Sequence, residues 1–267
     1  MWRSIEPITL VIPCLNEADC LRPLLDEVFR TLGPRLAEVI VVDDGSTDDS
    51  PEILAALMQA EPRLIAVTHA ASSGQSSAVR TGVRAAETEW IATLDADGQN
   101  PPDQVKALIL ALDALPSGHR RIGLVQGERR RRRDGSGRRW ASMLANRIRA
   151  ATLGDDVRDS ACGLKLFRRR AYLELPFFDH IHRFLPAMMR REGWDVLVVP
   201  VAHRPRIAGR SHYSNLQRAL VGVIDLAGAA WLQRRRSPTA SPGRTWVHSP
   251  DAAPPRSPRQ LALESTS

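Results

Sequence analysis

Residues 90–102 read WIATLDADGQNPP, and this stretch predicts both a fold class and the position of a site. Its apolar start, residues 90–94, is typical of a buried strand, and Asp95 and Asp97 follow at the carboxyl end. Open α/β sheets bind their ligands at that edge. Two carboxylates this close repel each other unless a hard divalent cation lies between them and a phosphate. The alternative is a solvated acidic turn before a helix that starts at Pro101 and Pro102.

Two apolar runs upstream end in the same way. Residues 8–12 (ITLVI) lead into PCLNE at 13–17, and residues 39–42 (VIVV) lead into DDGSTD at 43–48. In a parallel sheet the carboxyl ends of such strands meet at one edge. Three strands therefore deliver acidic groups to the same place, which a set of unrelated turns explains less well than a shared site.

Strand and helix patterns alternate along the first half of the chain. Helical spacing of apolar residues predicts helices near residues 21–32, 53–58, 78–86 and 103–112, with further strands at 64–67 and 122–125. Later, residues 140–151 have a helical pattern and residues 163–167 a strand pattern. This order predicts an α/β fold with a mostly parallel central sheet and helices on both faces.

The composition favours a phosphate-rich ligand or an anionic surface. The 267 residues include 37 Lys and Arg against 30 Asp and Glu, a net charge of +7, and only Lys106 and Lys165 are lysines. Arginine makes bidentate contacts with phosphates. Nucleic acid would suit the charge, but 5% aromatic residues and the lack of a helix-turn-helix, zinc or stacking motif argue against it. The three cysteines lack metal-ligand spacing and are interpreted as reduced, small apolar residues.

The chain shows no pattern of export or membrane spanning. Residues 1–6 contain no apolar signal region, and no run reaches the roughly 18–20 apolar residues that a membrane span requires. We therefore expect a cytoplasmic protein, peripheral on the cytoplasmic face of the inner membrane.

Six ordered motifs between about residues 5 and 232 resemble the inverting GT-A glycosyltransferases of family 2. Within that family the chain is similar to the polyprenyl-phosphate hexose transferases, the group of the dolichyl-phosphate mannosyltransferases and bactoprenyl-phosphate glucosyltransferases. The motifs are Pro13-x-x-Asn16-Glu17, Val42-Asp43-Asp44-Gly45-Ser46-Thr47-Asp48, Asp95-Ala96-Asp97-x-Gln99-x-Pro101-Pro102, Arg138-x-x-x-Ser142-x-x-x-Asn146, Asp159-x-x-Cys162-Gly163-x-Lys165 and Arg206-x-x-Gly209-x-Ser211-x-Tyr213.

The resemblance implies a GT-A fold, a nucleotide-diphosphate sugar as donor (GDP-mannose or UDP-hexose), and a Mg2+ or Mn2+ ion. It places the donor against Pro13, Glu17, Asp44, Gly74, Asp95, Ala96 and Arg206, and the metal on Asp97 and Gln99 with Asp95. Gly74 lies in the segment SSGQSSA at 72–78, where free amides at a helix start can face a diphosphate. In the resembling enzymes a Lys often stands where this chain has Gln75.

The resemblance also implies a polyprenyl phosphate acceptor held by Arg129, Arg138 and Ser142, in the basic run at residues 128–139. Arg139 fits as well as Arg138, and the run is alternatively a solvated, disordered segment. The catalytic positions would be Asp159, as base or orienting group, and Arg206, which would neutralise the leaving nucleotide. A turn-capping role is the alternative for Asp159.

The expected organisation is a catalytic domain at residues 1–215, an amphipathic helix at 216–236 and a disordered tail at 237–267. The helix has a broad apolar face with arginines near both ends, and its interior Asp225 argues against spanning. It either lies on an anionic membrane surface or packs on the core.

The predicted function is thus metal-dependent, inverting transfer of a hexose to a polyprenyl phosphate. One alternative is a soluble glycosyltransferase that acts on a saccharide or a small molecule. Another is a non-catalytic protein that binds nucleotide sugars or anionic membranes, against which the intact motif at residues 95–99 argues.

Overall fold

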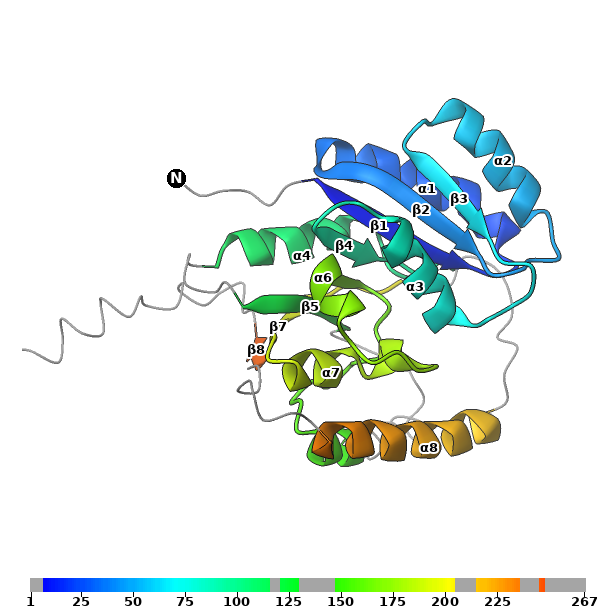
Figure 1. Cartoon of the computed structure of the whole chain (residues 1–267). Helices are drawn as coiled ribbons and strands as arrows, with labels where there is room; N and C mark the ends of the chain where they lie inside the picture. The colour runs from blue at the N-terminus through cyan, green and yellow to red at the C-terminus, as the bar shows by residue number, and fades with distance from the viewer. Residues whose placement is uncertain (1–6, 116–120, 130–146, 205–214, 236–244, 248–267) are drawn as a thin grey trace, which may run out of the picture.

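One mixed sheet organises the part of the chain that the structure describes. A computed structural model describes residues 7–115, 121–129, 147–204, 215–235 and 245–247, and eight of its strands form a sheet in the order β3-β2-β1-β4-β6-β5-β7-β8 (Figure 1). The strands are β1 Ile8–Cys14, β2 Leu36–Asp43, β3 Leu64–Thr68, β4 Trp90–Thr93, β5 Ile122–Arg129, β6 Lys165–Arg168, β7 Asp195–Val201 and β8 Thr245–Val247.

All neighbours in this sheet pair in parallel except β6, which is antiparallel to both β4 and β5. The predicted, mostly parallel sheet is therefore confirmed. Since β1, β2 and β4 run side by side in one direction, their carboxyl ends lie at a single edge. The residues after these three strands are those that the sequence singled out.

Helices cover both faces of the sheet, as predicted. One apolar cluster lies under α1 (Ala18–Leu32), α2 (Ser50–Ala60) and α4 (Asp103–Asp113), and the other lies under α3 (Gln75–Ala85), α6 (Arg169–Leu173) and α7 (Leu185–Arg191). Two short 3-10 turns, Gly33–Arg35 and Ile181–Arg183, complete the described connections. Of the helix expected at 140–151, the structure describes a helical segment over residues 147–153.

Helix α8, Asn215–Arg234, packs on the core with one face. Arg191 donates to the carbonyl of Leu232 at 3.0 Å, and Ala229 is fully buried. In Figure 1 α8 lies along the outside of α7. Within the described ranges, no helix combines the length and the apolarity that crossing a bilayer demands.

The end of the chain differs in part from the expected disordered tail. Thr245–Val247 form β8, which extends the sheet in parallel beside β7. The Thr245 hydroxyl also donates to the carbonyl of Asp155 at 2.9 Å. The composition of the segment suggested disorder, but these three residues form a strand because they pair with β7, which lies far away in the sequence. The other residues of the 237–267 segment lie outside the described ranges.

Close packing of α3 on the sheet depends on Gly82. A Cβ atom at this position would lie 2.5 Å from Cγ1 of Val11 in β1 and 3.2 Å from Cγ2 of Val42 in β2. Both valines are fully buried, so neither can move aside freely. We predict that Gly82→Ala lowers the free energy of unfolding by about 1–3 kcal/mol, as overpacking does, although alanine favours helix.

The matched control is Gly228→Ala in α8, where no heavy atom lies within 4 Å of the added Cβ. Chemical denaturation should show that this control is neutral or is stabilised by up to about 1 kcal/mol. Equal effects of the two substitutions would mean that α3 does not depend on the close approach.

Candidate active site

The turns that follow β1 and β2 are tied to each other at the carboxyl edge of the sheet. The Asn16 side-chain oxygen accepts from the Thr47 N–H at 2.8 Å, and Asp48 Oδ2 accepts from the Ala18 N–H at 3.0 Å. These bonds fix the start of α1, where Glu17 occupies the capping position without a side-chain cap bond. Asn16 and Asp48 thus place the Glu17 side chain at the edge and do not themselves need to meet a ligand.

Asp44 organises the loop that contains Gly74. Its Oδ1 accepts from His69 Nδ1 at 2.7 Å and from the Ser73 N–H at 2.9 Å, and its Oδ2 accepts from Ser72 Oγ and the Gly74 N–H at 2.8 Å each. Burial raises the pKa of Asp44, but the Ser73 N–H and the other donors outweigh it, so the net pKa lies below the ordinary value. The carboxylate therefore stays charged and holds the loop closed around itself.

This arrangement gives Gly74 its conformation. Gly74 has φ +88° and precedes the first residue of α3, so a glycine suits the position. Its own N–H already bonds Asp44, which leaves the following amides of α3 to face the sheet edge. The segment predicted to approach a diphosphate is therefore rigid, and the rigidity comes from a residue 30 positions earlier.

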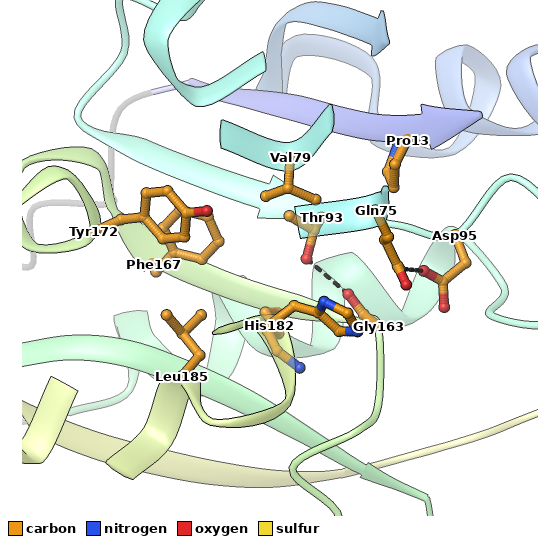
Figure 2. Close-up of a pocket in the computed structure, with 11 residues that line it drawn as sticks. Pro13, Gln75, Val79, Thr93, Asp95, Gly163, Phe167, Tyr172, His182 and Leu185 are labelled. Carbon is orange, nitrogen blue, oxygen red and sulfur yellow. Dashed lines mark hydrogen bonds between the residues drawn. The ribbon is translucent and has the colours of Figure 1, made fainter. Parts of the chain in front are cut away.

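Asp95 lies at the centre of the edge, just after β4. Its Oδ1 accepts from Gln75 Nε2 at 2.9 Å, and its carboxylate packs directly on the α-carbon of Gly163 (Figure 2). Burial, and then the charge of Asp97, raise the pKa of Asp95 to about 6. Gln75 thus takes the place of the lysine common in the resembling enzymes, as a neutral donor to this carboxylate.

The turn that carries Asp97 and Gln99 is held in place by hydrogen bonds from Arg204, a residue distant in the sequence. Asp97 Oδ1 accepts from the Gln99 N–H at 3.1 Å, and the Gln99 carbonyl accepts from the Arg204 N–H at 2.9 Å. The Arg204 guanidinium also donates to the Gly98 carbonyl and pairs with Glu27 of α1 at 2.8 Å. Ala96 is buried beneath the turn, so the half-buried Asp97 and Gln99 side chains remain at the surface of the edge.

The donor atoms of this turn fit a hard divalent cation. They are the carboxylates of Asp95 and Asp97 and the amide oxygens of Gln99 and Asn100, and the buried Oδ1 of Asn100 has no hydrogen-bond partner. No cluster of three or more His, Cys, Asp or Glu side chains suited to a metal occurs in the described ranges. The protein would hence supply a few oxygen ligands, as is usual for Mg2+, which also takes oxygens from phosphates and water.

Arg129 and Asp159 form a two-pronged ion pair beside this turn. Arg129 Nε donates to Asp159 Oδ2 at 2.6 Å and Nη2 donates to Oδ1 at 2.7 Å. Arg129 is the last residue of β5, and its positive charge, like that of Lys165, acts to lower the pKa of Asp95. The predicted acceptor residue and the predicted catalytic carboxylate are therefore partners, and they lie within electrostatic reach of the Asp95 site.

Two buried side chains hold the segment from Asp159 to Gly163. Gln126 Nε2 donates to the carbonyls of Asp159 and Cys162 at 3.4 Å each, and Lys165 Nζ donates to the Ser160 carbonyl at 3.0 Å and to that of Cys162. Thr93 Oγ1 also donates to the Gly163 carbonyl at 2.7 Å. Sequence reasoning included Lys165 in a motif but gave no role to Lys165 or Gln126, because their bonds are to main-chain carbonyls, which leave no pattern.

The pocket in Figure 2 is apolar at the end away from Asp95, and the half-buried His182 lies between that end and Gly163. Phe167 and Tyr172 stack with ring centroids 4.9 Å apart, and Leu185 packs nearby. His182 Nδ1 lies 2.7 Å from Ser76 Oγ, while burial and the nearby Lys165 keep its pKa well below the ordinary value. His182 is thus neutral at pH 7, and its sequence context gave no indication that it lies in the pocket.

The structure brings together most of the predicted site residues. Asp44 and Ala96 lie beneath the sheet edge, and Glu17 lies at the adjoining helix start. The other described site residues lie on or beside that edge: Pro13, Gly74, Asp95, Asp97, Gln99, Arg129 and Asp159. Arg138, Arg139, Ser142 and Arg206, with the rest of their motifs up to Tyr213, lie outside the described residues.

Comparison with known proteins agrees with this geometry. A family model described as Glycosyl transferase family 2 matches residues 9–175. The chain is 34% identical over 217 residues to an undecaprenyl-phosphate 4-deoxy-4-formamido-L-arabinose transferase of Klebsiella pneumoniae subsp. pneumoniae, covering 80% of this chain and 64% of the relative. It is 31% identical over 226 residues to a protein of that name from Pseudomonas paraeruginosa, covering 83% and 64%. The chain thus spans about 64% of the length of these relatives.

Similar solved structures include glucosyl-3-phosphoglycerate synthase from Mycobacterium tuberculosis. One, in complex with Mn2+, uridine diphosphate and phosphoglyceric acid, matches with a TM-score of 0.61 and 20% identity over 88% of this chain and 80% of that chain. Another structure of this synthase gives a TM-score of 0.63 and 19% identity, covering 88% and 83%. At these identities the likeness concerns the fold, and the predicted GT-A fold is confirmed.

The contact between Asp95 and Gly163 leads to a direct test. A methyl group at position 163 would overlap the Asp95 carboxylate, which must then turn away and lose its bond from Gln75. If this edge holds the nucleotide and the metal that the sequence predicts, Gly163→Ala should weaken the binding of uridine diphosphate with Mn2+ by about tenfold or more, since charge-assisted contacts are worth roughly 1.5–3 kcal/mol.

Calorimetric titration measures this affinity, with Gly228→Ala as the matched control in open space. Thermal unfolding must show that the Gly163→Ala protein is folded at the titration temperature. Unchanged affinity in a folded variant would remove Asp95 from the nucleotide and metal site.

Proposed function

The chain belongs to glycosyltransferase family 2, and we propose that it transfers a glycosyl group from a nucleotide-diphosphate sugar to a polyprenyl phosphate. One observation carries this proposal. The Asp95 and Asp97 turn and the Arg129–Asp159 pair lie at one sheet edge, where the charge of Arg129 reaches Asp95. The proposed site for a metal and a diphosphate and the proposed site for a second phosphate would thereby be adjacent.

The donor half of the site would bind the nucleotide and the diphosphate. Glu17 and Pro13 would contact base and ribose at the end of β1, and the rigid loop at Gly74 would present its amides to the diphosphate. A bound Mg2+ or Mn2+, held by Asp97 and Gln99 with Asp95, would supply charge stabilisation for the departing diphosphate. Asp95 would orient the ribose or the metal shell through the oxygen that does not bond Gln75.

The acceptor half would bind a phosphate monoester. Such a group is already anionic at neutral pH, so it can attack the anomeric carbon without a strong base. The attack would come from the face opposite the nucleotide and would invert the anomeric centre. Arg129, Arg138 and Ser142 would hold the acceptor phosphate, and Arg206 would neutralise the leaving nucleotide. Before the acceptor binds, Asp159 would orient Arg129, because both of its oxygens accept from that side chain.

The relatives support a polyprenyl acceptor and widen the choice of sugar. Their names specify undecaprenyl phosphate and a formamido derivative of L-arabinose, whereas the motifs alone suggested a hexose carried by GDP or UDP. The pocket next to Asp95 combines an apolar end at Phe167 and Tyr172 with the neutral imidazole of His182. Such a lining would suit a sugar with a modified, less polar substituent as well as a hexose.

The outer face of α8 supports contact with an anionic membrane, in line with the predicted peripheral location; the cytoplasmic face remains a prediction from the sequence. Val223, Ile224 and Trp231 are 68%, 67% and 57% exposed on the face turned away from the core. Asp225, the only acidic residue of α8, faces inward, with Oδ2 2.9 Å from His180 Nδ1. The outward face thus has no negative charge, and Arg234 and Arg235 are exposed at its end. Apolar side chains bordered by arginines are typical of helices that lie in a bilayer interface.

The transfer reaction and its metal requirement can be tested together. Full-length protein, undecaprenyl phosphate and a panel of nucleotide sugars with Mg2+ or Mn2+ should yield a glycolipid detectable by mass spectrometry. The panel includes GDP-mannose, UDP-glucose and UDP-linked 4-formamido-L-arabinose. We predict that EDTA abolishes the product and that Asp97→Asn lowers kcat/KM by about 100-fold or more, the size expected when charge stabilisation of the leaving group is lost.

The matched control for this test is Asp103→Asn, the same chemical change at an exposed position in the first turn of α4. Asp103→Asn should keep near-normal turnover. Full activity in excess EDTA would disprove the metal assignment, and the absence of a glycolipid with every donor would disprove the polyprenyl acceptor.

The membrane contact has its own prediction. Liposomes with 30% phosphatidylglycerol should bind the full-length protein and release much of it at high salt, because exposed charges are screened over about 10 Å at 0.1 M salt. The double variant Ile224→Asn and Trp231→Ala should bind several-fold less, since it loses two interfacial apolar side chains.

Leu110→Asn is the matched control, because Leu110 is 61% exposed on α4, which covers the other face of the sheet. Equal losses for the two proteins would mean that α8 is not the docking face. Gel filtration of the unmodified protein also tests whether the α8 face pairs with a second copy.

A further inference from the structure

The Arg129–Asp159 pair has the form of an occupied anion site. The guanidinium presents Nε and Nη2 side by side to the two oxygens of one carboxylate, at 2.6 and 2.7 Å, and the Arg129 N–H adds a third, longer bond at 3.3 Å. This fork is the arrangement with which arginine also receives two oxygens of a phosphate. Carboxylate and phosphate are therefore interchangeable ligands for this group of donors.

The pair is also accessible from the edge of the sheet. The side chains of Arg129 and Asp159 are 14% and 13% exposed, so each is mostly desolvated but neither is sealed. The bond to Asp159 raises the pKa of Arg129, which is charged under all ordinary conditions. An anion that replaced Asp159 would thus meet a permanent positive charge in a partly desolvated place, where such contacts are strong.

Asp159 can leave Arg129 without disturbing the chain around it. Its carbonyl is held by Gln126, and the residues that follow are held by Lys165 through the Ser160 and Cys162 carbonyls. None of these bonds involves the Asp159 carboxylate. The bonds that hold the main chain of this segment would therefore stay in place when the anion on Arg129 is exchanged.

We propose that Asp159 is a built-in substitute for the acceptor phosphate, and that a phosphate monoester binds to Arg129 by displacing the Asp159 carboxylate. The two anions do not share the guanidinium fork of Arg129, because a carboxylate and a phosphate dianion would then repel each other at contact distance. The identity of the ligand as a polyprenyl phosphate rests on the proposed function. The exchange itself requires only the phosphate chemistry.

The exchange gives Asp159 a role that differs from that of a general base. With Asp159 in place, Arg129 is neutralised and oriented, so an empty acceptor site does not expose an unpaired guanidinium beside Asp95. When a phosphate binds to Nε and Nη2 of Arg129, the displaced Asp159 carboxylate turns toward the solvent side of the pair. Acceptor affinity is thus set by a competition that is internal to the protein.

Removing the charge of Asp159 tests this competition. In Asp159→Asn the side chain keeps its size but no longer competes as an anion, so the Kd of inorganic phosphate and the KM of undecaprenyl phosphate should each fall by about tenfold, the worth of one charge-assisted contact. Donor affinity should stay unchanged. Asp159→Glu restores a carboxylate and should return phosphate binding toward the value of the unmodified protein.

The double variant Arg129→Gln with Asp159→Asn locates the effect. If Arg129 is the exchanged donor, the gain from Asp159→Asn should vanish in the Arg129→Gln background, and the two changes should be non-additive. If Asp159→Asn folds poorly by circular dichroism, Asp159→Ser provides a second neutral side chain. A merely structural Asp159 would make acceptor binding weaker in every neutral variant, and that result would overturn the proposal.

The two phosphate probes separate this inference from the proposed function. Tighter binding of inorganic phosphate by Asp159→Asn, together with no transfer to undecaprenyl phosphate, would support the exchange and disprove the lipid acceptor. Transfer to undecaprenyl phosphate with an unchanged or higher KM in the neutral variants would support the function and disprove the exchange.

Discussion

The half-buried carboxylate of Asp95 is the constraint around which the site is arranged. Burial and the charge of Asp97 raise the pKa of Asp95. The charges of Lys165 and Arg129 and the hydrogen bond from the Gln75 amide act in the opposite direction and lower it. Each of these partners comes from a different part of the chain. Because the carboxylate also fills the space beside Gly163, its position is set by van der Waals contact as well as by charge. A group placed so firmly can orient a ligand without being reorganised by it.

The sequence made the sheet edge predictable because local patterns determine it. Apolar runs that end in acidic turns placed β1, β2 and β4, and the carboxyl ends of parallel strands meet wherever such runs alternate with helices. By contrast, β8 was missed because its three residues, Thr245–Val247, are too few to show a period and gain their structure from β7. Strands that are determined by neighbouring residues could be predicted, whereas a strand that is determined by pairing with a distant strand could not.

The same holds for the site: the sequence indicated its residues, but the contacts between distant residues are seen only in the structure. The strand and turn pattern identified Asp95 and Asp97, and the family resemblance pointed to Arg129 and Asp159. Neither indicates that Arg129 and Asp159, 30 residues apart, bond each other. Nor does spacing distinguish Asp44 as an organiser of the Gly74 loop from Asp44 as a ligand contact. Four protein donors on its two oxygens make that distinction, and they are brought together only by the packing of β2, β3 and α3.

The carboxylates of the site differ in how their charge is balanced, and this difference assigns them distinct tasks. Asp44 is satisfied by neutral donors of its own loop, so it is a permanent part of the scaffold. Asp95 and Asp97 repel each other, and the proposed divalent cation would balance their charges. Asp159 accepts two bonds from the guanidinium of Arg129, which can bind two oxygens of a phosphate in the same way. In the proposed function, ligand binding at this edge would therefore complete the charge balance on the donor side and exchange one anion for another on the acceptor side.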